Sequence, residues 1–251
     1  MKRILIMIFS VFVLSASAQT WWTYPELGNA APCAIIETEE AYIHTGGSFL
    51  YAGGACYLAS INKNSGMTNW VRFFPDRRTW GNAVVKTPEG GLAVLSTNAR
   101  FHGAANTFWL IKTNALGESL WTKGFLPQGQ PVAQPYFLAL FPPDSGFIMG
   151  GRNYAGGNII LARTNQSGET IWTRYGVARE SIYRDMEICG LTTRTDKIYL
   201  LGSASVDLPT GPSIWRTFLA EINAAGQVIN KTEYVDDWLR GGASIRDYLC
   251  S

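Results

Sequence analysis

Residues that could carry out acid–base or metal chemistry are few and scattered in this sequence. Its 251 residues include only two histidines, His44 and His102. A histidine-based metal site or a Ser-His-Asp triad would need one of them with partners at a suitable spacing, and neither has such partners. Paired carboxylates occur at Glu39-Glu40 and Asp236-Asp237, but adjacency alone does not make an acid–base pair. We therefore predict no catalytic residue, no metal site and no cofactor, and we expect the histidines to lie at the surface or in turns.

The four cysteines do not form a zinc motif, because no C-x-x-C spacing occurs. They are Cys33, Cys56, Cys189 and Cys250. A disulfide between Cys33 and Cys56 is one option, provided that their Cα atoms come within about 7 Å. Free, buried thiols are an equal option for Cys189 and Cys250.

Arginine and aromatic residues gather in the segments that connect the apolar runs. Arginine binds carboxylates in a bidentate manner, and aromatic rings stack on sugars or on peptide aromatics. The candidate ligand-binding residues are Arg78, Trp80, Arg100, Arg152, Tyr154, Tyr183, Arg184, Trp215 and Trp238. The alternative is that these side chains only pack the bases of loops. If they do bind, the expected partner is a glycan or a peptide.

A glycine followed four residues later by a tryptophan recurs along the chain. The pairs lie 51 residues apart and are Gly66 with Trp70, Gly117 with Trp121, and Gly168 with Trp172. The series continues 58 residues later at Gly226, where Asn230 takes the place of the tryptophan. Such a fixed period indicates a repeat architecture.

Each glycine follows a short strand-like run: "YLASIN", "WLIKTN", "ILARTN" and "FLAEIN". An apolar run, a Gly turn and a second apolar run predict a β-hairpin, and two further strand-like runs precede each hairpin. Four strands in about 50 residues are typical of a β-propeller blade. We predict an all-β propeller with blades at about 31–75, 81–126, 136–177 and 187–235. The glycine would supply a positive φ, and the tryptophan would wedge between neighbouring blades.

The two ends of the chain carry fragments of a further blade. Trp22-Thr23 aligns with Trp121-Thr122, so residues 20–25 are expected to form an outer strand, and residues 242–249 a first strand. Either the chain is truncated from a longer gene, which we favour, or four blades close into a small ring. An incomplete ring would expose sheet faces and favour self-association.

The first 18 residues have the features of a secretory signal peptide. Lys2 and Arg3 precede an apolar run at 4–14, and "SASA" ends at Ala18. No later run is long enough to span a membrane. Removing the signal leaves 19 basic and 19 acidic residues, and this neutrality argues against nucleic-acid binding. The protein is expected in the periplasm or outside the cell.

The stretch "FWLIKTNALGESLWTKGF" resembles the repeat of secreted β-propeller proteins common in Bacteroidetes. Many of these carry a C-terminal type IX secretion sorting domain, which this sequence lacks. The stretch "ASINKNSGMTNW" is similar to the tryptophan-docking repeat of quinoprotein dehydrogenases. This second resemblance implies the fold but not the quinone cofactor, because the vicinal Cys-Cys pair is missing.

Two classes of function follow from these observations. The first is a secreted, non-catalytic binding or surface-associated module. The second is a quinoprotein-like or glycan-active enzyme with an active site on the propeller rim. Convergence of Arg, Asp and aromatic side chains in one pocket would distinguish them.

Overall fold

The computed structural model describes residues 30–50, 54–74, 79–98, 107–125, 133–153, 156–208 and 213–234. Several sequence predictions fall outside these ranges. They concern the signal peptide 1–18, the strands 20–25 and 242–249, and the residues Arg78, Arg100, His102, Tyr154, Trp238 and Cys250.

Sixteen strands form four antiparallel sheets, and each sheet is built from four consecutive strands. In chain order they are β1 (Ala30–Glu37), β2 (Ala41–Ser48), β3 (Ala55–Asn62), β4 (Thr68–Phe74), β5 (Thr79–Lys86), β6 (Leu92–Asn98), β7 (Thr107–Thr113), β8 (Ser119–Phe125), β9 (Ala133–Phe141), β10 (Gly146–Asn153), β11 (Asn158–Thr164), β12 (Thr170–Tyr175), β13 (Tyr183–Arg194), β14 (Lys197–Val206), β15 (Ile214–Ile222) and β16 (Val228–Tyr234). The prediction of an all-β propeller with four-stranded blades is confirmed. Within the described ranges, there is no helix long and apolar enough to cross a membrane.

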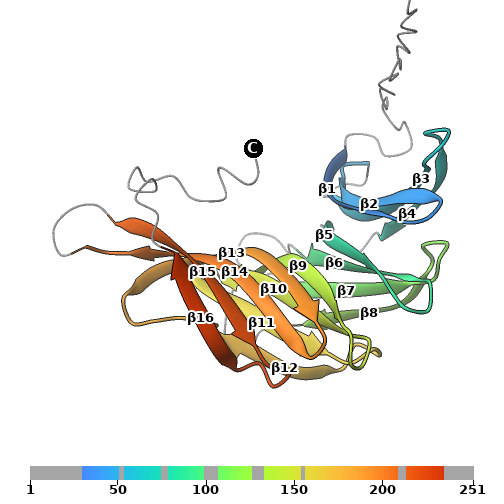
Figure 1. The fold of residues 1–251 in the computed structure, drawn as a ribbon. Coiled ribbons are helices and arrows are strands. Elements are labelled where there is room, and N and C mark those ends of the chain that lie inside the picture. The colour runs from blue at the N-terminus through green and yellow to red at the C-terminus, as the bar shows by residue number, and fades with distance from the viewer. Residues whose placement is uncertain are drawn as a thin grey trace, which may run out of the picture.

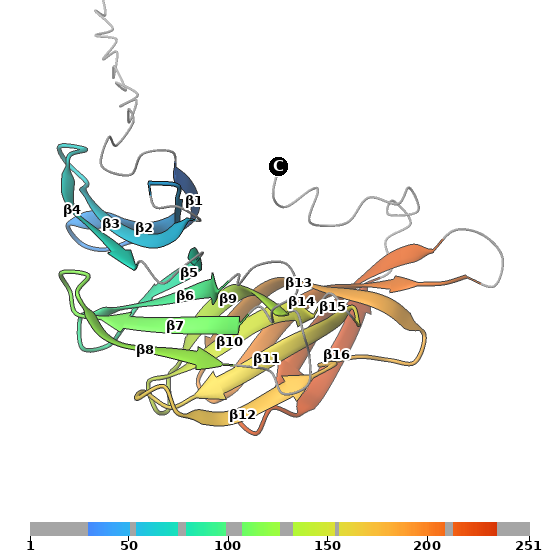
Figure 2. The same cartoon turned by 180° about the vertical axis from the view of Figure 1, so that it is seen from behind.

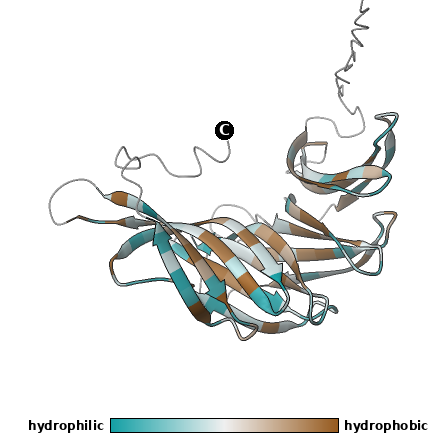
Figure 3. Cartoon of the chain, viewed as in Figure 1, coloured by the Kyte–Doolittle hydropathy of each residue, from teal (hydrophilic) through white to brown (hydrophobic). Residues whose placement is uncertain are grey.

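The blades pack face to face through three hydrophobic cores. One core joins blades one and two around Leu58 and Val94. A second core joins blades two and three around Phe108 and Ile160. The third core joins blades three and four around Leu161 and Phe218. Hydrophobic residues accordingly form bands across the strands, while the turns are mostly hydrophilic (Figure 3).

Blades one and four do not meet in a shared core among the residues that the structure describes. The four sheets follow one another in an arc, and the sheets β1–β4 and β13–β16 lie at its two ends in both views (Figures 1 and 2). The ring formed by the described residues is therefore open.

The glycine and tryptophan of the repeated Gly-x-x-x-Trp pattern make packing contacts between successive blades. The four turn glycines have φ values of 71°, 74°, 76° and 79°, at Gly66, Gly117, Gly168 and Gly226. A Cβ atom on Gly117 would lie 2.6 Å from Cζ3 of Trp70, and one on Gly168 would lie 2.6 Å from Cη2 of Trp121. Each tryptophan thus covers the turn of the next blade, and glycine serves both the backbone conformation and the close approach.

At two positions on the face that points away from blade three, blade four has a polar residue where blade two has an aromatic one, whereas Leu219 and Tyr234 on that face are exposed. Asn230 stands at the position of the wedge tryptophan. Thr217, which pairs with Tyr234, stands where blade two has Phe108, which pairs with Phe125.

Cys33 and Cys56 are free thiols, so the disulfide option is not realised. Cys33 lies on β1 and Cys56 on β3, and β2 runs between them. Two strand spacings of about 4.8 Å place the two backbones about 10 Å apart, which exceeds the usual Cα separation of a disulfide. Burial raises the pKa of Cys56 to about 12.

His44 is buried within β2, contrary to the expected surface or turn position. Its Nδ1 lies 3.1 Å from the Tyr57 hydroxyl, and the two rings meet edge to face. Burial lowers the pKa of His44. The period of a strand fixes which residues share a face, but it does not identify which face a neighbouring element covers.

Candidate functional site

The predicted rim residues that the structure describes lie at corresponding strand ends but do not converge on one pocket. Trp80 is the second residue of β5, and its ring covers the backbone of blade one. A Cβ atom on Gly47 would lie only 2.2 Å from Cδ2 of Trp80. Phe49 meets the ring edge-on, at 5.2 Å between centroids, and Nε1 of Trp80 donates to Sγ of Cys33 at 3.1 Å. Trp80 therefore packs two blades together.

Arg152 connects blade three to blade four. Its Nη1 donates to Oε1 of Glu187 at 2.6 Å, and its Nη2 donates to Oδ2 of Asp185 at 2.5 Å. The Arg152 side chain is only 14% exposed. Both carboxylates are on β13, the first strand of blade four, so this arginine is engaged in an interblade ion pair. The described residues include no group of three or more His, Cys, Asp or Glu side chains that could hold a metal ion.

The other three candidates have separate environments. Arg184 is 70% exposed and lies 3.6 Å from Asp207. Trp215 is half-buried on β15. Tyr183 is only 2% exposed and stacks on Phe218, so it cannot present its ring to a ligand.

Tyr183 belongs to a partly exposed polar network that also includes Glu180, Arg216, Lys231 and Glu233. Its hydroxyl contacts both Lys231 and Glu233. Lys231 also pairs with Glu180 at 2.5 Å, and Arg216 donates to Glu233 at 3.2 Å. Burial by itself would raise the pKa of Glu233, but the hydrogen bonds from Tyr183 and Lys231, the charge of Lys231 and the hydrogen bond from Arg216 outweigh it and lower that pKa to about 2.

This network predicts a loss of stability in acid. The folded pKa of Glu233 is below its ordinary value, so the stabilisation is complete above about pH 4.5 and is lost as the pH falls toward 2. We expect the free energy of unfolding to decrease over this range, and Glu233→Gln to flatten the decrease. Urea denaturation at pH 5, 4 and 3 measures both effects.

Glu169→Gln provides the matched control, because Glu169 is exposed and bonds only the neighbouring Asn165 turn. It should leave the acid profile close to that of the wild type. An unchanged profile in Glu233→Gln would contradict the assignment.

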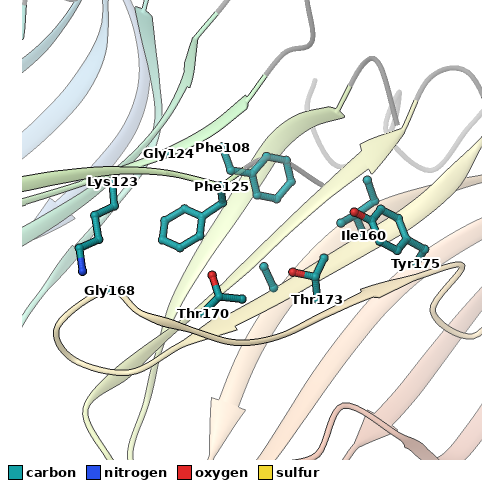
Figure 4. A pocket seen from close by; sticks show the side chains of 10 residues that line it. Phe108, Lys123, Gly124, Phe125, Ile160, Gly168, Thr170, Thr173 and Tyr175 are labelled. Atoms are coloured by element: carbon teal, nitrogen blue, oxygen red, sulfur yellow. The ribbon is translucent and has the colours of Figure 1, made fainter. Parts of the chain in front are cut away.

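A cavity of about 680 Å³ lies between the outer strands of blades two and three. It combines aromatic walls with a few polar groups, the usual composition of a small-molecule site. The lining residues are Phe108, Lys123, Gly124, Phe125, Ile160, Ala162, Gly168, Thr170, Thr173 and Tyr175. Figure 4 shows Lys123 at one end near Gly168 and Tyr175 at the other end beside Ile160, with the two phenylalanine rings between them.

The cavity lies where the repeat lacks an aromatic side chain. The relevant position is on the third strand of each blade. Its residue pairs with a residue of the fourth strand that lies three positions after the wedge tryptophan, or after Asn230 in blade four. These pairs are Tyr57–Phe73, Trp109–Gly124, Ile160–Tyr175 and Phe218–Glu233. Only blade three has an aliphatic residue at this position, and its face toward blade two holds the cavity.

The corresponding positions between blades three and four carry larger side chains. Phe218 takes the place of Ile160, Lys231 that of Thr173, and Glu233 that of Tyr175. Lys231 lies 5.2 Å from the Phe218 ring centroid and 4.3 Å from that of Tyr183. The same architecture thus places different side chains at equivalent positions of the two interfaces.

Sequence reasoning missed the cavity, although its signal was present. The four aligned runs begin with Tyr57, Trp109, Ile160 and Phe218. The aliphatic residue in this otherwise aromatic column marks the position of the hollow. The sequence analysis selected residues of the connecting segments instead, because arginine and aromatic residues often contact ligands.

Comparisons with known proteins support the fold and do not assign an activity. No protein-family model matches the sequence, and no curated protein matches it. Among solved structures, hydrazine synthase from Kuenenia stuttgartiensis is similar, with a TM-score of 0.55 and 12% identity over 78% of this chain and 53% of that chain. This chain therefore spans about half the length of that protein.

Two further structures show weaker similarity. The GH43 endo-arabinanase from Bacillus licheniformis has a TM-score of 0.44 and 11% identity, over 82% of this chain and 80% of that chain. A protein of unknown function from Bacteroides caccae has a TM-score of 0.33 and 10% identity, over 85% and 84%. At such low identity, the similarity to hydrazine synthase shows a shared fold alone.

Proposed function

We propose that this protein is an exported, non-catalytic propeller that binds a short saccharide in the cavity between blades two and three. The observation that carries the proposal is the cavity between blades two and three. Its buried floor includes Ile160, at a position where the other three blades have an aromatic side chain. Export rests on the N-terminal sequence 1–18.

The lining chemistry suits a sugar. The rings of Phe125 and Tyr175 provide apolar faces for stacking, and the hydroxyls of Thr170, Thr173 and Tyr175 are donors and acceptors for sugar hydroxyls. A tyrosine hydroxyl is protonated at neutral pH because its ordinary pKa is about 10, and burial raises the pKa of Tyr175 further. The volume is within the range of about 300–1,000 Å³ that small-ligand sites occupy.

Binding is favoured over catalysis because the described acidic residues with a central position are already engaged. Asp185 and Glu187, on the first strand of blade four, both pair with Arg152. The cavity lining contains lysine, threonine, tyrosine and phenylalanine, which bind and orient a ligand. Most glycoside hydrolases use a pair of Asp or Glu carboxyl groups at the substrate, and the lining of this cavity contains neither residue type.

Filling the cavity should abolish binding without unfolding the protein. We expect Ile160→Trp to remove all signals that the wild type gives on an oligosaccharide array, because the indole would occupy the ligand's space. Blade two already has Trp109 at this position, so the repeat tolerates the larger side chain. Thermal unfolding by circular dichroism verifies that the variant folds.

A second pair of variants tests the site from its open side. Tyr175→Ala should weaken binding about tenfold, since stacking on an aromatic ring contributes about 1 kcal/mol or more. Tyr234→Ala is the matched control, because Tyr234 ends β16 as Tyr175 ends β12. Array binding that survives Ile160→Trp would overturn the proposal.

A further inference from the structure

We infer that the saccharide is acidic, and that Lys123 binds a carboxylate of a uronic acid unit. This inference rests on the proposed function and specifies its ligand class. It derives from a cation at the end of the cavity whose counterparts in blades one and three are differently engaged.

Each of the first three blades has a cation two residues after the wedge tryptophan. These cations lie over the tryptophan rings at 5.7, 5.7 and 5.6 Å from the ring centroids, and they are Arg72, Lys123 and Arg174. All three pass over the turn glycine of the next blade. For Lys123, a Cβ atom on Gly168 would lie 3.1 Å from its Cδ.

The two arginines use their donors on the protein itself. Arg72 donates from Nη1 to the carbonyl of Val71 at 3.1 Å. Arg174 donates from Nη2 to the carbonyl of Ala225, in the turn of blade four, at 3.0 Å. Lysine lacks the forked guanidinium that makes these bonds.

Lys123 lines one end of the cavity, and its Nζ lies 5.7 Å from the Trp121 ring centroid. Among the residues that the structure describes, none accepts a hydrogen bond from its Nζ, and no carboxylate lies within ion-pair distance. The acidic side chains of the adjoining turns are engaged elsewhere. Glu169 accepts from Nδ2 of Asn165 at 2.8 Å, and Glu89 pairs with Lys112 and accepts from Gln166.

The Lys123 residue is half-buried, and an ammonium group with no protein acceptor forms strong, charge-assisted hydrogen bonds with an anion. The rest of the lining is neutral, so a single negative charge beside stacking faces and hydroxyl groups matches the site. A uronic acid combines all three features in one sugar ring. Figure 4 places Lys123 and Tyr175 at opposite ends of the lining, which favours an oligosaccharide over a single sugar.

The test compares one sugar with and without its charge. We would titrate the full secreted chain with α-1,4-linked trigalacturonate and with its methyl ester, by isothermal titration calorimetry at low salt. The acid should bind at least tenfold more tightly than the ester. Lys123→Met, which keeps the aliphatic stem over Trp121, should reduce the affinity for the acid to that for the ester.

Lys86→Met is the control, because Lys86 lies exposed at the end of β5 and has no role in the cavity. It should leave both affinities unchanged. Equal binding of acid and ester, or full binding of the acid by a folded Lys123→Met variant, would overturn the inference.

The same variants separate this inference from the proposed function. Suppose that neither trisaccharide binds, but a neutral oligosaccharide binds the wild type and not Ile160→Trp. Then the acidic ligand is wrong and the proposed site stands. If no oligosaccharide shows binding that Ile160→Trp removes, both are overturned.

Discussion

Replacing Trp172 with alanine is expected to lower the free energy of unfolding by about 3–5 kcal/mol. Trp172 is only 8% exposed in the core between blades three and four. Its Nε1 donates to the carbonyl of Ala224 at 2.9 Å, and its ring lies against Gly226. The substitution would leave a cavity, an unpaired carbonyl and a loosened blade contact. Urea denaturation followed by circular dichroism measures the change.

Trp215→Ala is the control for this effect. Trp215 is half-buried on β15 and belongs to none of the interblade cores of the described residues. Its loss should cost about 1 kcal/mol or less. Equal destabilisation by the two variants would refute the idea that the wedge tryptophans hold successive blades together.

The second large effect is expected at Arg152. Arg152→Met should lower the free energy of unfolding by about 2–3 kcal/mol, because it leaves Asp185 and Glu187 as two uncompensated charges in a partly buried place. The value is below that for a fully buried pair, since the Asp185 side chain is 33% exposed. Thermal and urea unfolding of the variant provide the measurement.

Neutralising the carboxylates should reverse most of this loss. The triple variant Arg152→Met, Asp185→Asn, Glu187→Gln removes the two negative charges that have no partner in the single variant. We expect it to recover at least half of the lost stability. If the triple variant were less stable than Arg152→Met alone, the ion pair would not be the source of the effect.

The repeat was predictable because its signals are local. A glycine that needs positive φ and a tryptophan four residues later fix a turn and a wedge, and both are visible at Gly117 and Trp121 without any knowledge of tertiary structure. The same holds for the strand runs that became β3, β7, β11 and β15.

The burial and the contacts of individual polar residues could not be predicted from local signals. Arg152 and Tyr183 were expected on a ligand-binding rim, but Asp185 of the neighbouring blade pairs with the first, and Phe218 stacks on the buried ring of the second. Cys33 and Cys56 seemed able to pair until the order of strands placed β2 between them. Each outcome depends on which strand becomes a neighbour, and the local sequence does not encode that.

The cavity could be predicted from the sequence only in part. Ile160 departs from an aromatic column that could be read from the aligned repeats. The departure predicts missing volume, but only the packing of blade two against blade three determines whether that volume stays open. In blade four, the equivalent positions hold Lys231 and Glu233, which pair with each other.

The central claim is that a saccharide occupies the hollow beside Ile160, and methyl-labelled NMR spectroscopy tests it most directly. Isoleucine δ1 and threonine methyl groups would be labelled, and the oligosaccharide that gives the strongest array signal would be titrated into the protein. The account predicts chemical-shift changes at Ile160, Thr170 and Thr173 and none at Ile222, which lies in the core between blades three and four. Shifts confined to residues outside the cavity would contradict it.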